Sequence, residues 1–137
     1  MKNAKSISWL LATIVLTTAP SSQAQQPAKI PRIGFQLDSP AAALAARIEG
    51  FRQGLRDLGY VEGKNIIVEL RSSEGKAERR SEIAAEWARL KVDLIVSAGP
   101  TITRALREAT TTIPIVMGQD TDPVGSGFVA SLAKPGG

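Results

Sequence analysis

Three short polar segments contain the residues best suited to bind a ligand, and each follows a run of strand-forming residues. They are Ser39, then Gly99, Pro100 and Thr101, and finally Asp120, Thr121 and Asp122. Hydroxyl groups and free backbone amides at a helix start can hold a carboxylate or a phosphate, whereas an aspartate can hold an amine. Together they would suit a zwitterion such as an amino acid. The simpler interpretation is that the hydroxyl residues cap helices and the aspartates form turns.

The residue inventory excludes several kinds of chemistry. The 137 residues include no histidine and no cysteine, so a Ser-His-Asp triad, a cysteine nucleophile, a disulfide framework and a Cys/His zinc site are all ruled out. Asp120 and Asp122 could ligate a metal ion, but two carboxylates alone make an incomplete calcium or magnesium site. We therefore expect no catalytic residues, no metal and no cofactor.

A glycine motif near the end of the sequence offers one alternative. Gly125, Gly127 and Ala130 match the spacing of the dinucleotide-binding fingerprint. In that fingerprint a hydrophobic strand leads directly into the first glycine, whereas here the polar residues 119–123 precede it. We therefore do not expect a dinucleotide site here.

The first residues have the pattern of a secretory signal peptide. Lys2 and Lys5 precede an apolar stretch at 7–19, and Ala24 ends a segment of small and polar residues. The apolar stretch is too short to span a bilayer as a helix, which takes about 20 residues. We predict a signal peptide at 1–24, cleavage after Ala24 and no permanent membrane anchor. In a Gram-negative cell the mature chain would then be periplasmic.

The mature part alternates predicted strands and helices. Leu44, Ile48, Phe51, Leu55 and Leu58 recur at helical spacing and form one apolar stripe, and Gly59 ends that helix. A second helix contains Ile83, Trp87 and Leu90, and a third covers 102–109. The predicted strands are at 30–37, 66–70, 92–96 and 113–117.

This order predicts an α/β fold with an open parallel sheet and helices on both faces. In such sheets ligands bind outside the carboxyl ends of the strands, which is where the three polar segments fall. The formal net charge of +4 would drop to +2 on loss of Lys2 and Lys5. Because both signs of charge are mixed along each helix, we expect a solvated surface and no nucleic-acid partner.

Several longer segments resemble the ABC transporter substrate-binding proteins related to tryptophan and tyrosine binders. The most specific is EGFRQGLRDLGYVEGKNI at 49–66, and the last is DPVGSGFVASLAKPGG at 122–137. The segments at 31–35, 93–96 and 112–116 also follow the family pattern.

The resemblance implies a type I periplasmic-binding, flavodoxin-like lobe without catalysis. Two such lobes joined by a hinge would close on a small-molecule solute and deliver it to an ABC permease in the inner membrane. Residues 25–137 would form the N-terminal lobe, with the second lobe absent from this sequence. The first-lobe contacts would come from Ser39, from Gly99 to Thr101 and from Asp120 to Asp122. The solute would be a small molecule such as an amino acid or an organic anion.

Other functions stay open at this stage. A secreted α/β enzyme could use Asp120 or Asp122 as an acid or a base. A sensory binding module, or a truncated remnant without function, would keep the fold without serving a permease.

Overall fold

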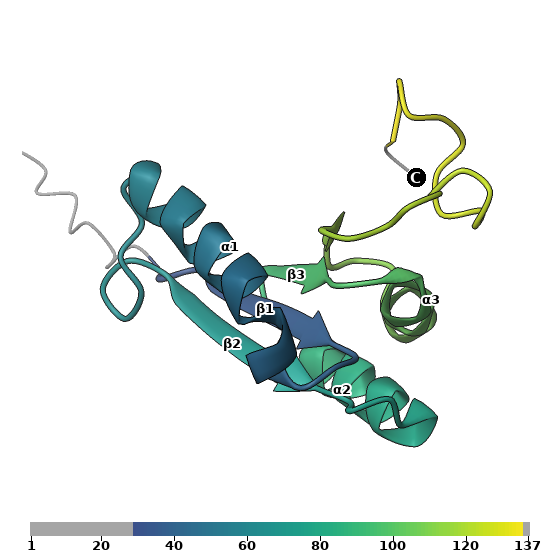
Figure 1. Cartoon of the computed structure of the whole chain (residues 1–137), viewed down its shortest axis with the longest axis horizontal. Helices are drawn as coiled ribbons and strands as arrows, with labels where there is room; N and C mark the ends of the chain where they lie inside the picture. Colours follow the sequence, from purple (N-terminus) through teal and green to yellow (C-terminus); the bar gives the residue numbers. More distant parts are fainter. Residues whose placement is uncertain (1–28, 136–137) are drawn as a thin grey trace, which may run out of the picture.

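The computed structural model describes residues 29–135, which form a four-stranded parallel sheet with helices on both faces (Figure 1). The strand order is β2-β1-β3-β4. The elements are β1 (Arg32–Leu37), a 3-10 turn (Ala41–Leu44), α1 (Ala45–Asp57), β2 (Ile67–Ser72), α2 (Ala77–Leu90), β3 (Leu94–Ser97), α3 (Pro100–Ala109) and β4 (Ile115–Met117). The predicted alternation and the parallel sheet are confirmed. The predicted signal peptide at 1–24 lies outside the described residues.

The two faces of the sheet bury different side chains, because successive residues of a strand point in opposite directions. On β3, Val96 packs with Phe35, Leu37 and Ile48 under α1. Its neighbour Ile95 belongs to a separate cluster with side chains of α2 and α3. One apolar strand thus supports helices on both sides, as the sequence predicts for a parallel sheet.

Trp87 is the largest fully buried side chain, and it fixes α2 against the sheet. A Cβ atom added at Gly34 would lie 2.9 Å from the Trp87 ring, so the indole rests directly on the backbone of β1. The guanidinium carbon of Arg71 lies 4.2 Å from the ring centroid and also forms an ion pair with Glu86. Glycine at position 34 therefore makes room for the ring.

The boundaries of the elements differ from the sequence predictions at a few positions. Leu58 was expected on the buried stripe of the first helix, but α1 ends at Asp57 and Leu58 is 76% exposed. Leu90, at the last position of α2, is also exposed. Helix α3 begins at Pro100 rather than Ile102, because proline fits the first helical position, where no N–H bond is needed.

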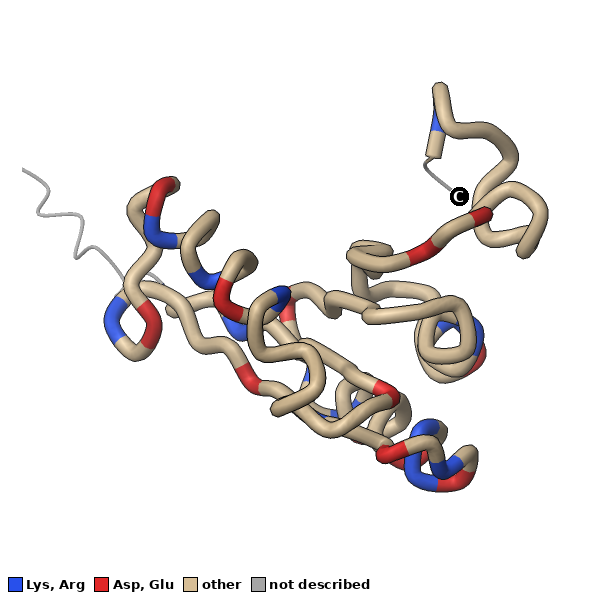
Figure 2. Tube along the Cα trace, in the orientation of Figure 1, with Lys and Arg blue, Asp and Glu red and all other residues tan. Residues whose placement is uncertain are grey.

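Strand β4 forms one edge of the described sheet. Strand β4 pairs only with β3 among the described residues, and Val116 at its centre is 46% exposed. The segment after β4 extends away from the sheet and contains turns rather than a helix (Figure 1). Positive and negative residues are interspersed along the helices (Figure 2). Within residues 29–135, no helix has the length and apolar character that crossing a membrane requires.

Candidate functional site at the carboxyl ends of the strands

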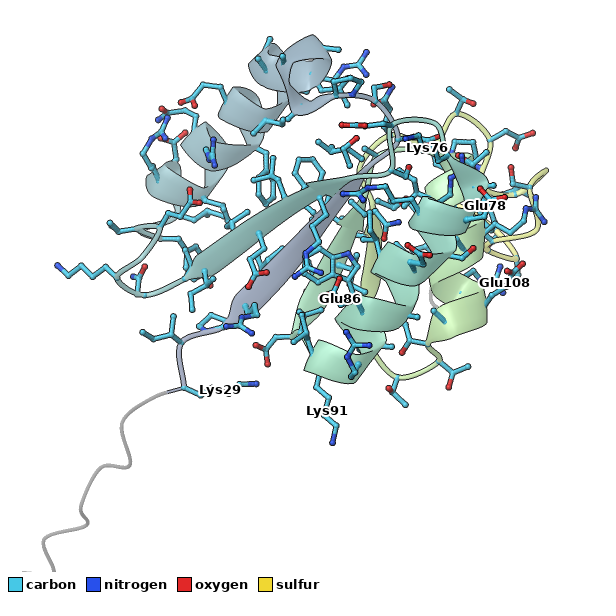
Figure 3. All side chains as sticks on the ribbon, turned by 90° about the horizontal axis from the view of Figure 1, so that it is seen from below. Lys29, Lys76, Glu78, Glu86, Lys91 and Glu108 are labelled. Atoms are coloured by element: carbon cyan, nitrogen blue, oxygen red, sulfur yellow. The ribbon has the colours of Figure 1, made fainter. Side chains whose placement is uncertain are left out.

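The strand register brings the predicted ligand-binding segments to one edge of the sheet. Leu37 at the end of β1 is aligned with Ser72 at the end of β2, and Ser97 at the end of β3 is aligned with Met117 at the end of β4. The segments that follow these residues therefore emerge together. Lys76 and Glu78, at the start of α2, mark this end of the molecule, and Lys29 and Lys91 mark the opposite end (Figure 3).

Asp38, the residue after β1, connects three of these segments. Its Oδ1 accepts a hydrogen bond of 2.5 Å from the Ser73 hydroxyl and bonds of 3.1 and 3.0 Å from the Arg80 guanidinium. Its Oδ2 accepts a bond of 3.0 Å from Arg80 and one of 3.4 Å from the Thr101 hydroxyl. The backbone carbonyl of Arg80 in turn accepts a bond from the buried Gln36 side chain. Asp38 is thus fully occupied by protein donors.

The charge of Asp38 is stabilised by this arrangement. Burial raises the pKa of the carboxyl, but hydrogen bonds from Ser73 and Arg80, the positive charge of Arg80 and the Thr101 hydroxyl outweigh it and leave the pKa below its ordinary value. Asp38 is therefore ionised at neutral pH and holds Arg80 in place. This pair joins β1 to α2 and is not available to a solute.

The N-terminus of α3 is the best-formed binding feature at this edge. No side chain caps it, and Pro100 at the first helical position has no N–H. The Thr103 N–H already donates to the Gly99 carbonyl, so the N–H groups of Thr101 and Ile102 remain without a helical acceptor. Ile102 is 0% exposed, so only the N–H of the exposed Thr101 lies where an anion at the positive end of the helix dipole could reach it.

Gly99 shapes this turn. Its φ of 145° and ψ of 160° belong to a region that only glycine adopts readily. The conformation directs the Gly99 carbonyl inward, where it accepts a bond from the Thr103 N–H and lies within hydrogen-bond distance of the Ser97 and Thr103 hydroxyls. The backbone turn at the end of β3 is thus held by buried groups.

Asp120 points into the protein. Its Oδ2 accepts a bond of 3.0 Å from the Thr103 hydroxyl, which lies 2.7 Å from the Ser97 hydroxyl. The other oxygen, Oδ1, is buried and has no partner among the described residues. Ser97 is 0% exposed and Thr103 is 1% exposed. The carboxylate therefore connects the segment after β4 to the start of α3.

The remaining predicted residues are exposed and make few side-chain contacts. The Asp122 Oδ1 accepts a bond of 2.8 Å from the Gly125 N–H, which is the turn that the simpler interpretation anticipates. Within residues 29–135, no hydrogen bond reaches the side chains of Ser39 or Thr121. Ser39 does not cap a helix, since Pro40 precedes the 3-10 turn, and its carbonyl accepts a bond from Ser72.

The structure also adds residues that the sequence did not single out. Ser73, Arg80, Ser97 and Thr103 hold the site segments together, although none was predicted as a site residue. The position of Thr103 directly after the apolar Ile102 on a predicted helix is a weak signal for a buried hydroxyl. Arg80 carries no such signal, because α2 is rich in charged residues and only packing selects the one that faces Asp38.

An apolar cavity lies next to the site. It has a volume of about 140 Å³ and is lined mainly by α1 and by β1 and β3, with Phe35 and Phe51 among its walls. Ala98, Gly118 and Gln119 border it at the carboxyl edge. A larger hollow of about 590 Å³ is lined mostly by the end of α3, β4 and the final segment. Within the described part of the chain, no cluster of three or more acidic residues could hold a metal ion.

Comparisons with known proteins agree with this architecture. The family model described as "ABC transporter substrate binding protein" matches residues 37–137. A tyrosine-binding protein of Clostridioides difficile strain R20291 is 38% identical over 89 residues, which are 65% of this chain and 26% of that protein.

Solved structures give the same result. A conserved domain protein of Vibrio cholerae O1 biovar El Tor has a TM-score of 0.73 at 33% identity, over 79% of this chain and 36% of the other. A ligand-free, open substrate-binding protein with adhesive properties from Clostridium difficile has a TM-score of 0.72 at 32% identity, over 78% and 36%. A Streptococcus pneumoniae ABC domain in complex with L-Trp has a TM-score of 0.72 at 27% identity, over 78% and 36%.

This chain spans about a quarter to a third of the length of these relatives. The family match nevertheless covers most of the chain, from the end of β1 onward, and the structural match covers 79% of the chain. The chain belongs to the ABC transporter substrate-binding protein family.

Proposed function

We propose that this chain is the N-terminal lobe, at residues 25–137, of a solute-binding component of an ABC importer. The lobe would bind a small molecule such as an amino acid or a small organic anion and deliver it, with a second lobe, to a permease in the inner membrane. The cleaved leader at 1–24 would place it in the periplasm. A binding rather than a catalytic role is supported by the names of the relatives, which are binding proteins.

The uncapped N-terminus of α3 is the observation that carries this proposal. The N–H of the exposed Thr101 offers a hydrogen bond to the carboxylate of a solute, and the positive end of the helix dipole favours that anion. The exposed Asp122 offers an acceptor to an amine through Oδ2, since only Oδ1 is used by Gly125. Ser39, Gly99, Pro100 and Thr121 line the same edge.

The relatives suggest which solutes to test first. One is named as a tyrosine-binding protein and another was solved with L-Trp. The apolar cavity that borders Gly118 and Gln119 supports a solute with an apolar side chain. Tyrosine, tryptophan and leucine therefore head the panel, each with its des-amino carboxylic acid.

The test is an NMR titration of the 15N-labelled chain with this panel. We expect saturable shifts of the Thr101 and Ile102 amides at millimolar concentrations, because one lobe covers only part of a solute. If these amides do not respond to any solute, the proposal is wrong.

A matched pair of variants tests the role of the helix end. Pro100→Glu puts a negative charge at the first position of α3, where it stabilises the helix but repels a bound carboxylate. We expect binding about fivefold weaker with an unchanged or higher melting temperature. Pro100→Gln has nearly the same shape without the charge and should bind like the parent chain.

A further inference from the structure

We infer that Ser97, Thr103 and Asp120 are positioning residues that join the segment after β4 to the N-terminus of α3, and that Asp120 does not touch the solute. This inference rests on the proposed function and assigns roles within the same site. It separates Asp120 from Asp122, which the sequence alone treats alike as acceptors for an amine.

The Asp120 carboxylate points toward Thr103. Oδ2 is used by the Thr103 hydroxyl at 3.0 Å, and Oδ1 is buried, so that no solvent-sized group reaches it. A solute amine has about the size of a water molecule. It therefore cannot contact Oδ1 without moving the segment after β4, and Oδ2 is already used by the Thr103 hydroxyl.

The carboxylate of Asp120 sets the direction of the hydrogen bonds in this network. An ionised carboxylate only accepts, so the single proton of the Thr103 hydroxyl is directed to Asp120. The Ser97 hydroxyl then donates to Thr103 at 2.7 Å or to the Gly99 carbonyl at 3.0 Å. A continuous buried chain of bonds runs from the end of β3 to the segment after β4.

These bonds control the position of the N-terminus of α3 relative to the segment after β4. Gly99 immediately precedes α3, and its carbonyl accepts a bond from the Thr103 N–H and lies 3.0 Å from the Ser97 hydroxyl oxygen. Residues 119–122 are attached to Thr103 through Asp120. The network thus fixes the N-terminus of α3, with Thr101, relative to the segment that carries Asp122, and both ends of a zwitterion depend on that spacing.

Thr103→Val is the central variant, because valine has nearly the same shape but lacks the hydroxyl. Thr103→Ser keeps the hydroxyl and serves as the matched control, and Asp120→Asn removes the charge. In NMR titrations with leucine and its des-amino analogue, we expect Thr103→Val and Asp120→Asn to weaken both solutes by a similar factor, roughly three- to tenfold. Thr103→Ser should bind like the parent chain.

Two results would overturn the inference. If Asp120→Asn weakens leucine strongly and leaves the des-amino analogue unchanged, Asp120 binds the amine directly. If Thr103→Val binds both solutes as the parent chain does, the network does not position the site.

The network can also be tested without a solute, by comparing the amide resonances of the variants with those of the parent chain. Thr103→Val should shift the amide resonances of residues 119–121, and Asp120→Asn should shift those of Thr101 and Ile102, since each change is transmitted across the network. Shifts confined to the mutated element would refute the inference independently of the proposed function.

Discussion

Breaking the Asp38–Arg80 pair should destabilise the chain measurably, and Arg80→Met is the change that does so with the least loss of packing. An exposed ion pair contributes about 0–1 kcal/mol, whereas breaking a fully buried one costs about 3–5 kcal/mol. The side chains of Arg80 and Asp38 are 17% and 30% exposed, which places this pair between the two limits. We expect Arg80→Met to lower the free energy of unfolding by about 1.5–2.5 kcal/mol at pH 7.

The loss should depend on pH in a defined direction. Because the pKa of Asp38 is depressed in the folded chain, its stabilising contribution is present above the ordinary value of 3.8 and is lost as the pH falls through the lower, folded value. The difference between the parent chain and Arg80→Met should therefore stay constant from pH 7 to about pH 5 and shrink below 3.8.

Urea unfolding followed by the fluorescence of the buried Trp87 measures this difference. Arg89→Met is a control on the same helix, because Arg89 is 73% exposed and its nitrogen lies 3.7 Å from Glu86. The control should change the free energy of unfolding by less than about 0.5 kcal/mol. If Arg80→Met costs no more than the control, or costs the same at pH 3 as at pH 7, the interpretation of the pair is wrong.

Three further predictions concern the sheet. Gly34→Ala should lower the free energy of unfolding in urea by about 1–3 kcal/mol, because the new methyl group meets Trp87. Gly54→Ala has open space around it and should be neutral or stabilising. Equal effects of the two substitutions would contradict this. Gly99→Ala should lower the free energy of unfolding by about 1–3 kcal/mol in the same assay, because the backbone conformation of Gly99 disfavours a Cβ atom. An unchanged urea midpoint would argue against this strain. Because the outer edge of β4 is unpaired among residues 29–135, we expect concentration-dependent self-association through it, and Val116→Lys should reduce it. Light scattering after size exclusion measures this, and identical masses for both proteins would count against edge pairing.

The fold was largely predictable from the sequence, because its signals are local and repeated. Apolar runs separated by helices of regular spacing indicate a parallel sheet, and the four observed strands overlap the predicted ones. The errors fall at helix ends. Leu58 continues the apolar spacing, but Gly59, with a φ of 84°, follows directly and the helix ends at Asp57. The apolar spacing alone does not show at which residue the helix ends.

The site was predictable only at the level of segments. The sequence places Ser39, Thr101 and Asp120 after strands, and the topology brings such segments to one edge. Which way each side chain points depends on packing between elements far apart in the chain. Asp120 is directed inward by Thr103, 17 residues earlier, and Asp38 is held by Arg80, 42 residues later.

The sequence by itself therefore determined the class of fold, the family and the edge at which we propose that a solute binds, since these follow from periodicity, turn residues and family-specific segments. The tertiary structure alone decided which polar groups are used internally and which remain for a ligand. The physical reason is that a buried hydrogen bond needs donor and acceptor within about 3 Å in a suitable direction, and only the packed helices bring them there. In this chain that distinction leaves Thr101 and Asp122 facing the solvent and turns Asp38 and Asp120 toward the protein.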